Sequence, residues 1–287
     1  MDVVTAPDRQ ALGQELADRV EGQAVAFERE VFPDGERYVR IDAELQGPVA
    51  LVADAYTNDL LVETLVAADA CREAGAQAVH LCVPYLAYAR QDRAFHPGEA
   101  VSSRAINRAL ASAGETLVTV DVHAPAVLDH FQGPSHNALA SEEIAEALGG
   151  FGAELILAPD AGALERAHEV AELLDLPFDH LEKTRISSTE VRMAPKKLDV
   201  NGLTAAIVDD IISTGGTMAM ATGQLLEHGC QRVLVAATHG IFANEAEDRL
   251  DKAGVERILV TDTLPTERSE VTCAGALARG LRAVQAP

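Results

Sequence analysis

Tryptophan is absent from this 287-residue chain, and aromatic residues make up only 4% of it. Because 48% of the residues are nevertheless hydrophobic, the core must be built from Val, Leu, Ile and Ala. Aliphatic cores of this kind suit parallel sheets covered by helices on both faces. The length fits two domains of ordinary size, or one large domain.

Cysteine and long apolar runs are also scarce. The four cysteines lie far apart, without a Cys-x-x-Cys pair or a His at zinc spacing, so neither a zinc knuckle nor a disulfide framework is indicated. No apolar run is long enough to cross a bilayer, and residues 1–10 carry acids and no apolar stretch. We therefore expect a cytoplasmic protein without a membrane partner.

Positive charge is in short supply, since 45 acidic residues face 23 basic ones and the formal net charge is -22. Only four of the basic residues are lysines: Lys183, Lys196, Lys197 and Lys252. Such a surface repels nucleic acid and anionic lipid, so no nucleic acid partner is expected. Ordinary solubility of an acidic protein would explain the charge, but we favour a high-salt cytoplasm, typical of a halophile, where counterions screen self-repulsion.

Short apolar runs alternate with helical patterns, which is the arrangement of βα units in a parallel sheet. Strands are predicted at 49–53, 78–83, 117–120, 154–158, 203–208, 232–237 and 257–261. Helices are predicted from Asn58 or Asp59 to Gly75, from Ser141 onward, over 161–174 and over 217–228. The glycine-rich stretch 149–152 predicts a boundary between domains 1–148 and 149–287.

One loop, residues 208–217, follows a predicted strand and precedes a predicted helix. Glycines allow positive φ and a close approach of the backbone, and the helix start offers N–H groups to a phosphate. Hydroxyls add donors, and paired carboxylates accept hydrogen bonds from sugar hydroxyls. A ribose phosphate would satisfy all of these groups: Asp209, Asp210, Ser213, Thr214, Gly215, Gly216 and Thr217. The loop is neither a Walker A motif nor a dinucleotide fingerprint, and the alternative is a plain glycine turn with two solvated aspartates.

The run Val-Asp-Asp-Ile-Ile-Ser-Thr-Gly-Gly-Thr at 208–217 resembles the phosphoribosyl diphosphate loop of the type I phosphoribosyltransferase fold. The resemblance implies an α/β protein with two such domains, each a mainly parallel sheet flanked by helices. Transferases that consume phosphoribosyl diphosphate use this loop. So do the ribose-phosphate pyrophosphokinases, which make that compound from ribose 5-phosphate and ATP.

Two further segments resemble the pyrophosphokinase branch: Phe-Pro-Asp-Gly-Glu-Arg-Tyr at 32–38 and Pro-Tyr-Leu-Ala-Tyr-Ala-Arg-Gln-Asp-Arg at 84–93. The second also makes physical sense, because its arginines follow a strand at the carboxyl end, where ligands of such sheets bind. The resemblance implies a homo-oligomer whose nucleotide site is shared between subunits. It assigns ATP to Phe32, Asp34, Gly35, Glu36, Arg90 and Gln91.

Magnesium is implied by the same resemblance. Asp121-Val122-His123 matches the family's Asp-x-His, and Asp160 in 159–162 matches a second metal position, so His123 and Asp160 are the predicted ligands of Mg²⁺. A lone His is a weak ligand for magnesium and could instead be a neutral donor. The stretch 129–137 departs from the acidic pattern of many relatives, so further ligands are not predicted there.

Lys183-Thr184-Arg185 resembles the family's mobile catalytic arm, which makes Lys183 and Arg185 the predicted catalytic residues, with Arg185 also facing ribose 5-phosphate. The implied reaction transfers the diphosphoryl group of ATP to the C1 hydroxyl of ribose 5-phosphate and releases AMP. Two alternatives are a phosphoribosyltransferase acting on a nucleobase and a non-catalytic regulatory homologue. The intact 183–185 and 208–217 motifs argue against a degenerate homologue.

Overall fold

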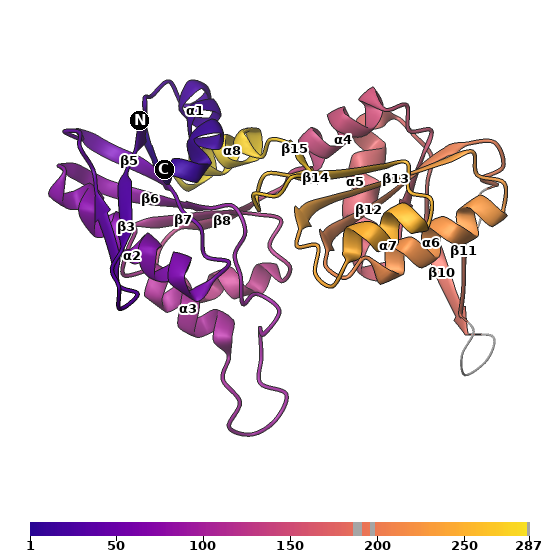
Figure 1. Cartoon of the computed structure of the whole chain (residues 1–287), viewed down its shortest axis with the longest axis horizontal. Coiled ribbons are helices and arrows are strands. Elements are labelled where there is room, and N and C mark those ends of the chain that lie inside the picture. The colour runs from indigo at the N-terminus through magenta and orange to yellow at the C-terminus, as the bar shows by residue number, and fades with distance from the viewer. Residues whose placement is uncertain (186–190, 196–198, 286–287) are drawn as a thin grey trace. The chain divides into compact units, whose positions relative to one another are not determined.

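The computed structural model describes residues 1–185, 191–195 and 199–285, with the backbone alone for the strand residues 182–185 and 191–195. The chain forms two compact units (Figure 1). Unit 1 is Met1–Leu139 together with Cys273–Pro287, and unit 2 is Ala140–Thr272. Both are α/β, as the alternating sequence pattern predicts.

Unit 1 is built on a parallel six-stranded sheet in the order β2-β1-β5-β6-β7-β8. Its strands are β1 (Asp2–Thr5), β2 (Ala24–Ala26), β5 (Gly47–Val52), β6 (Ala76–Val83), β7 (Thr116–Val120) and β8 (Ser135–Ala138). A separate antiparallel hairpin pairs β3 (Glu28–Val31) with β4 (Arg37–Arg40). The unit's helices are η1 (Pro7–Arg9), α1 (Gln10–Arg19), α2 (Asn58–Glu73), α3 (Ser102–Leu110), η2 (Pro125–His130) and α8 (Ala274–Gln285).

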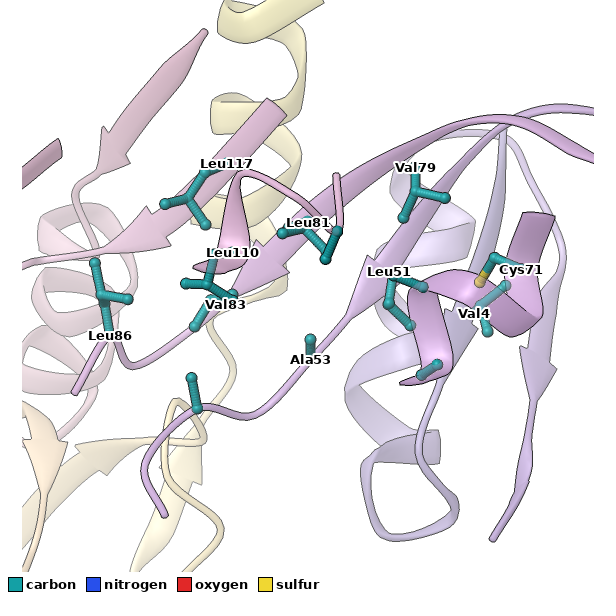
Figure 2. Packing of buried hydrophobic residues seen from close by; sticks show 14 of the residues in the cluster. Val4, Leu51, Ala53, Cys71, Val79, Leu81, Val83, Leu86, Leu110 and Leu117 are labelled. Carbon is teal, nitrogen blue, oxygen red and sulfur yellow. The ribbon is translucent and has the colours of Figure 1, made fainter. Parts of the chain in front are cut away.

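The sheet of unit 1 is covered on both faces. Alternate residues of β6, including Leu81, point into an aliphatic core with Cys71 of α2 and Leu110 of α3 (Figure 2). The opposite face packs against α1 and α8, and Gly280 of α8 lies so close to Val118 that an added Cβ would approach its Cγ1 to 2.4 Å. Two-sided burial explains why these strands read as continuous apolar runs.

Unit 2 contains a seven-stranded sheet in the order β11-β10-β9-β12-β13-β14-β15, parallel except for β11. Its strands are β9 (Leu155–Ala158), β10 (Phe178–Arg185), β11 (Val191–Pro195), β12 (Thr204–Ile212), β13 (Arg232–Gly240), β14 (Arg257–Thr261) and β15 (Ser269–Val271). Its helices are α4 (Ser141–Gly150), η3 (Ala161–Ala163), α5 (Leu164–Leu174), α6 (Gly216–Glu227) and α7 (Ala246–Lys252).

The central strands of unit 2 also face two cores. Ile207 of β12 packs in the cluster that contains Met218 of α6 and Leu250 of α7. Its neighbour Val208 belongs to the cluster on the other side, which holds residues of α4 and α5. Because both faces of β12 are buried, this strand is fixed in the middle of the sheet, and its carboxyl end delivers the loop 213–215.

The predicted boundary at 149–152 is wrong. Gly149 and Gly150 are the last residues of α4, which packs on α5 and the sheet of unit 2, so these glycines end a helix rather than link domains. The chain crosses between units at Leu139 and Ala140, and crosses back at Thr272 and Cys273. The amphipathic α8 returns because its apolar face packs against β7, β8 and α1 of unit 1.

All seven predicted strands are confirmed, and so are the four predicted helices. The start of α2 differs in detail, since Thr57 is the N-cap and its Oγ1 accepts a hydrogen bond from the N–H of Leu60 at 3.2 Å. The Thr57 hydroxyl, one residue before the predicted cap, thus binds an N–H group that has no partner within the helix. Among the described residues, no helix combines the length and the hydropathy needed to traverse a lipid bilayer.

Candidate functional site

The predicted sugar carboxylates lie in a strand, not in the loop. Strand β12 runs on to Ile212, and Asp209 pairs with Ala237 of β13. Aspartate disfavours strands, which is why the sequence placed the end of this strand at Val208. Both Asp209 and Asp210 are half-buried, whereas the preceding residues of β12 are fully buried. The site therefore begins inside the sheet, on a rigid strand.

The loop that follows has the conformation that the two glycines predict. Gly215 has φ of 68° and is the N-cap of α6, which starts at Gly216. A Cβ at Gly215 would also come within 3.2 Å of the carbonyl oxygen of Ala246, so the position is closed to larger residues. Thr214 and Thr217 are exposed and Ser213 is partly exposed, which leaves their hydroxyls accessible. The loop thus combines exposed donors with a helix start.

A third carboxylate belongs to the same edge of the sheet. Asp160 follows β9, the strand next to β12, and its Oδ1 accepts a hydrogen bond from the N–H of Gly162 at 2.8 Å. Burial, repulsion by Asp210 and, to a smaller extent, repulsion by Asp160 raise the pKa of Asp209 to about 7. The sequence did not predict this proximity, because 48 residues lie between Asp160 and Asp209 and only the sheet order makes their strands neighbours.

The predicted catalytic residues lie on an antiparallel ribbon. Lys183 pairs with Met193 and Arg185 pairs with Val191, in the ladder between β10 and β11. The structure describes the backbone of Lys183 and Arg185 but not their side chains. The structure therefore shows a strand at this motif, where none was predicted, and leaves the roles of Lys183 and Arg185 as predictions.

In unit 1 the first nucleotide motif forms the tip of the hairpin. The N–H of Phe32 donates to the carbonyl of Glu36 at 2.9 Å, and that of Gly35 donates to Phe32 at 2.8 Å. Gly35 has φ of 94°, and Asp34 accepts from the N–H of Glu36 at 3.3 Å. The tip is exposed, and the Phe32 ring packs edge-on against Tyr38 at 6.1 Å between centroids.

One buried carboxylate holds this hairpin to the body of unit 1. Glu63 of α2 is bound by Arg29 of β3 at 3.0 Å and by Arg37 of β4 at 3.4 Å, with its own side chain only 4% exposed. Arg37 also contacts Asp59 at 2.9 Å. Because the hairpin is not part of the six-stranded sheet, these ion pairs fix the position of its tip.

The second nucleotide motif follows β6. Tyr88 has φ of 64°, and its hydroxyl donates to Oδ1 of Asn58 at the start of α2. Arg90 is exposed, and its predicted contact with phosphate stays a prediction. The side chain of Gln91 reaches the carbonyls of Arg93 and Ala100, each at 3.4 Å, and so closes the base of the intervening loop. The structure gives Gln91 a loop-holding contact that the sequence did not predict.

The predicted metal motif of unit 1 follows β7. Asp121 is fully buried with φ of 44°, and its N–H donates to Ala138 at 2.9 Å, while His123 is exposed. Among the described residues, no group of three or more His, Cys, Asp or Glu side chains forms a metal cage. Magnesium usually keeps several waters and binds one or two carboxylates together with substrate phosphates, so a cage is not required. His123 and Asp160 belong to different units, and their joint role stays a prediction.

The site residues thus form one group in each unit. In unit 2, Asp160, Asp209, Asp210 and the loop 213–217 meet at the carboxyl ends of β9 and β12. In unit 1, the hairpin tip and the segment after β6 are both fixed by α2, through Glu63 and Asn58. The sequence missed Glu63, whose only signal was a charge inside an otherwise apolar helical face.

Comparison with known proteins shows the family to which the chain belongs. Residues 1–114 match the model for the N-terminal domain of ribose phosphate pyrophosphokinase, and 196–277 match that for the phosphoribosyl synthetase-associated domain. The chain is 41% identical over 286 residues to a ribose-phosphate pyrophosphokinase of Methanopyrus kandleri, which covers 98% of both chains. It is 47% identical over 244 residues to that of Pyrococcus furiosus, or 84% of this chain and 87% of the relative.

A solved structure covers the whole fold. Phosphoribosylpyrophosphate synthetase from Mycobacterium smegmatis superposes with a TM-score of 0.80 and 30% identity, over 99% of each chain. The architecture is therefore that of an α/β enzyme with two phosphoribosyltransferase-like domains. With the sequence identities added, the chain belongs to the ribose-phosphate pyrophosphokinase family.

Proposed function

We propose that this chain transfers the diphosphoryl group of ATP to the C1 hydroxyl of ribose 5-phosphate, giving 5-phosphoribosyl 1-diphosphate and AMP. The proposal depends on one observation. Asp209 and Asp210 lie on the central strand β12, and a glycine turn connects this strand to the start of α6. Carboxylates there accept hydrogen bonds from ribose hydroxyls, and the helix start receives the 5-phosphate.

Ribose 5-phosphate is assigned to unit 2. Gly215 and Gly216 bring the backbone close to the phosphate, while Ser213, Thr214 and Thr217 supply hydroxyl donors. Asp209 and Asp210 hold the sugar, and Arg185 is assigned to the same substrate by its motif. With the acceptor fixed in this way, its C1 hydroxyl is aligned for attack without a protein nucleophile.

ATP is assigned to unit 1. Arg90 offers an exposed guanidinium to phosphate oxygens, and Gln91 lies next to it. The exposed hairpin tip, with Phe32, Asp34, Gly35 and Glu36, is assigned to the nucleotide of a neighbouring subunit, which makes the active form a homo-oligomer. A cytoplasmic, high-salt environment fits the acidic composition.

Mg²⁺ is assigned to Asp160 and His123. The Oδ2 atom of Asp160 accepts no hydrogen bond from the described residues, and its carboxylate and that of Asp209 repel each other, so an oxygen-seeking cation fits there. When bound, the ion neutralises charge on the transferred phosphate oxygens. Lys183 and Arg185 are the groups assigned to stabilise the same oxygens in the transition state.

The test is the appearance of AMP when the purified protein receives ATP, ribose 5-phosphate and magnesium. We expect AMP and 5-phosphoribosyl 1-diphosphate in equal amounts, and neither from Asp209→Ala at the substrate concentration that half-saturates the unaltered protein. Varying donor, salt and phosphate in the same assay defines donor choice and salt optimum. Product formed only from a nucleobase and phosphoribosyl diphosphate, with no AMP from ATP, would identify a transferase instead.

A further inference from the structure

One side of the loop 213–215 is bound by the segment 241–249, which follows β13. We call this side of the loop its rear, and the opposite side its front. The N–H of Ile241 donates to the carbonyl of Ile212 at 2.9 Å, and the N–H of Ala243 donates to that of Ser213 at 2.9 Å. The next carbonyl, that of Thr214, accepts a hydrogen bond from Nη1 of Arg249 on α7. Three consecutive carbonyls therefore accept hydrogen bonds from donors of the segment 241–249.

The direction of these carbonyls also sets the direction of the N–H groups in the loop. In a trans peptide the C=O and the following N–H point in opposite directions. When the carbonyls of Ser213 and Thr214 point to the rear, the N–H groups of Thr214 and Gly215 point to the front. Neither N–H donates to a backbone carbonyl among the described residues. Successive amides aimed one way form a concave anion site, as the 5-phosphate requires.

The rear segment is itself strained. Phe242, Asn244 and Glu245 have φ of 50°, 54° and 57°, and none of them is glycine. A non-glycine residue in this conformation is strained, and it persists only where surrounding contacts over-determine it. One of these contacts is again Arg249, whose Nη2 donates to the carbonyl of Asn244 at 3.3 Å.

Arg249 thus joins the loop to its strained support with one guanidinium. Although the residue lies at the surface, its two terminal nitrogens bind two different carbonyls. A planar fork can do this, whereas the ammonium of lysine is a compact charge on a flexible stem. The start of α7 lies against the loop as well, since Gly215 approaches the carbonyl of Ala246.

We propose that Arg249 is a positioning residue for the ribose 5-phosphate site, holding the carbonyl of Thr214 to the rear so that the loop amides face the phosphate. The inference rests on the proposed function, because it concerns the same loop. It assigns Arg249 no contact with either substrate. Its effect is on the shape of the loop before the substrate arrives, and so on the binding of phosphate rather than on the transfer step.

Arg249→Lys is the decisive variant, because it keeps the positive charge and removes the fork. We expect the KM for ribose 5-phosphate to rise about ten-fold, with kcat and the KM for ATP changed less than about two-fold. Calorimetry with ribose 5-phosphate and with inorganic phosphate should show the same loss. An arginine that acted only through its charge would leave all of these values unchanged in the lysine variant.

Arg268→Lys is the matched control. Arg268 binds Glu247 at 2.9 Å and Asp251 at 3.2 Å, so it supports the same helix α7 without touching the loop. The melting temperature of Arg268→Lys should be close to that of Arg249→Lys. Its KM for ribose 5-phosphate should equal that of the unaltered protein. Calorimetry is run at a temperature where the circular dichroism of each variant matches that of the unaltered protein, which separates lost binding from lost folding.

Unchanged ribose 5-phosphate affinity in folded Arg249→Lys would overturn the inference. An equal rise in the KM for ribose 5-phosphate in Arg268→Lys would overturn it as well. The proposed function fails differently. It fails if the unaltered protein makes no AMP from ATP and ribose 5-phosphate, whatever Arg249 does.

Discussion

Asp160 and Asp209 occupy the carboxyl ends of two adjacent parallel strands, β9 and β12, and repel each other there. Together with burial and the neighbouring Asp210, this repulsion holds the pKa of Asp209 at about 7. Carboxylates with strongly shifted pKa values cluster at functional sites of proteins. The pair therefore joins the predicted sugar-binding carboxylate to the predicted metal position, and the effect of their repulsion on stability can be measured.

Asp209→Asn should stabilise the protein above neutral pH. The folded pKa of Asp209 lies above its unfolded value, so the folded state binds the extra proton, and stability is lost as pH rises from about 4 to about 7. Asparagine does not titrate. The difference in melting temperature between variant and unaltered protein should grow across that window and level off above it.

The control for this prediction is Asp248→Asn, which removes an exposed acid from α7. It removes the same formal charge as Asp209→Asn without altering β12. A constant difference between Asp209→Asn and the unaltered protein from pH 4 to 8 would contradict the raised pKa. The gain in stability should come with weaker ribose 5-phosphate binding, because the amide lacks the carboxylate's charge.

Gly215→Ala should damage both folding and substrate binding. Alanine at φ of 68° costs about 1 kcal/mol, and its Cβ would press on the carbonyl of Ala246 at 3.2 Å. Chemical denaturation should show a loss of about 2 kcal/mol, and the KM for ribose 5-phosphate should rise. Gly223→Ala in the same helix meets no atom within 4 Å and should instead stabilise by about 1 kcal/mol.

Glu63→Gln should loosen the hairpin that carries the exposed nucleotide motif. Removing one partner of a buried ion pair costs about 3 kcal/mol, because Arg29 and Arg37 then lose their shared carboxylate. The KM for ATP should rise while that for ribose 5-phosphate stays constant. Glu28→Gln removes an exposed pair with Arg40 on the same hairpin, and should change neither value. Equal effects of the two substitutions would argue against the anchoring role.

Lys183→Met should lower kcat far more than it lowers the affinity for ribose 5-phosphate. An interaction made only in the transition state reduces kcat and kcat/KM together, by about a hundred-fold or more for a charged group on phosphate oxygens. Turnover and calorimetry on the same preparation separate the two quantities. Lys252→Met, at the last residue of α7, serves as the control for loss of a lysine. Comparable losses in turnover and binding would contradict the assigned role of Lys183.

The hairpin and the end of β12 show where local sequence was insufficient. The motif at 32–38 marked a nucleotide loop, but its flanks carry charges rather than apolar residues, so β3 and β4 were not predicted. Their strands are stabilised by Glu63, which is 26 residues beyond Arg37. Similarly, β12 was predicted to end at Val208, because aspartate disfavours strands, and pairing with β13 overrode that preference.

The sequence by itself determined the aliphatic two-sided sheets, the positions of the central strands and the glycine-bent loop before α6, because periodicity and glycine chemistry act over a few residues. Tertiary structure alone decided that α4 belongs to unit 2 and α8 to unit 1. It also decided that Asp160 lies near Asp209, and that Arg249 donates a hydrogen bond to the carbonyl of Thr214. These relationships depend on the order of strands in a sheet and on which helix faces are covered. Both are long-range properties that no local pattern of residues specifies.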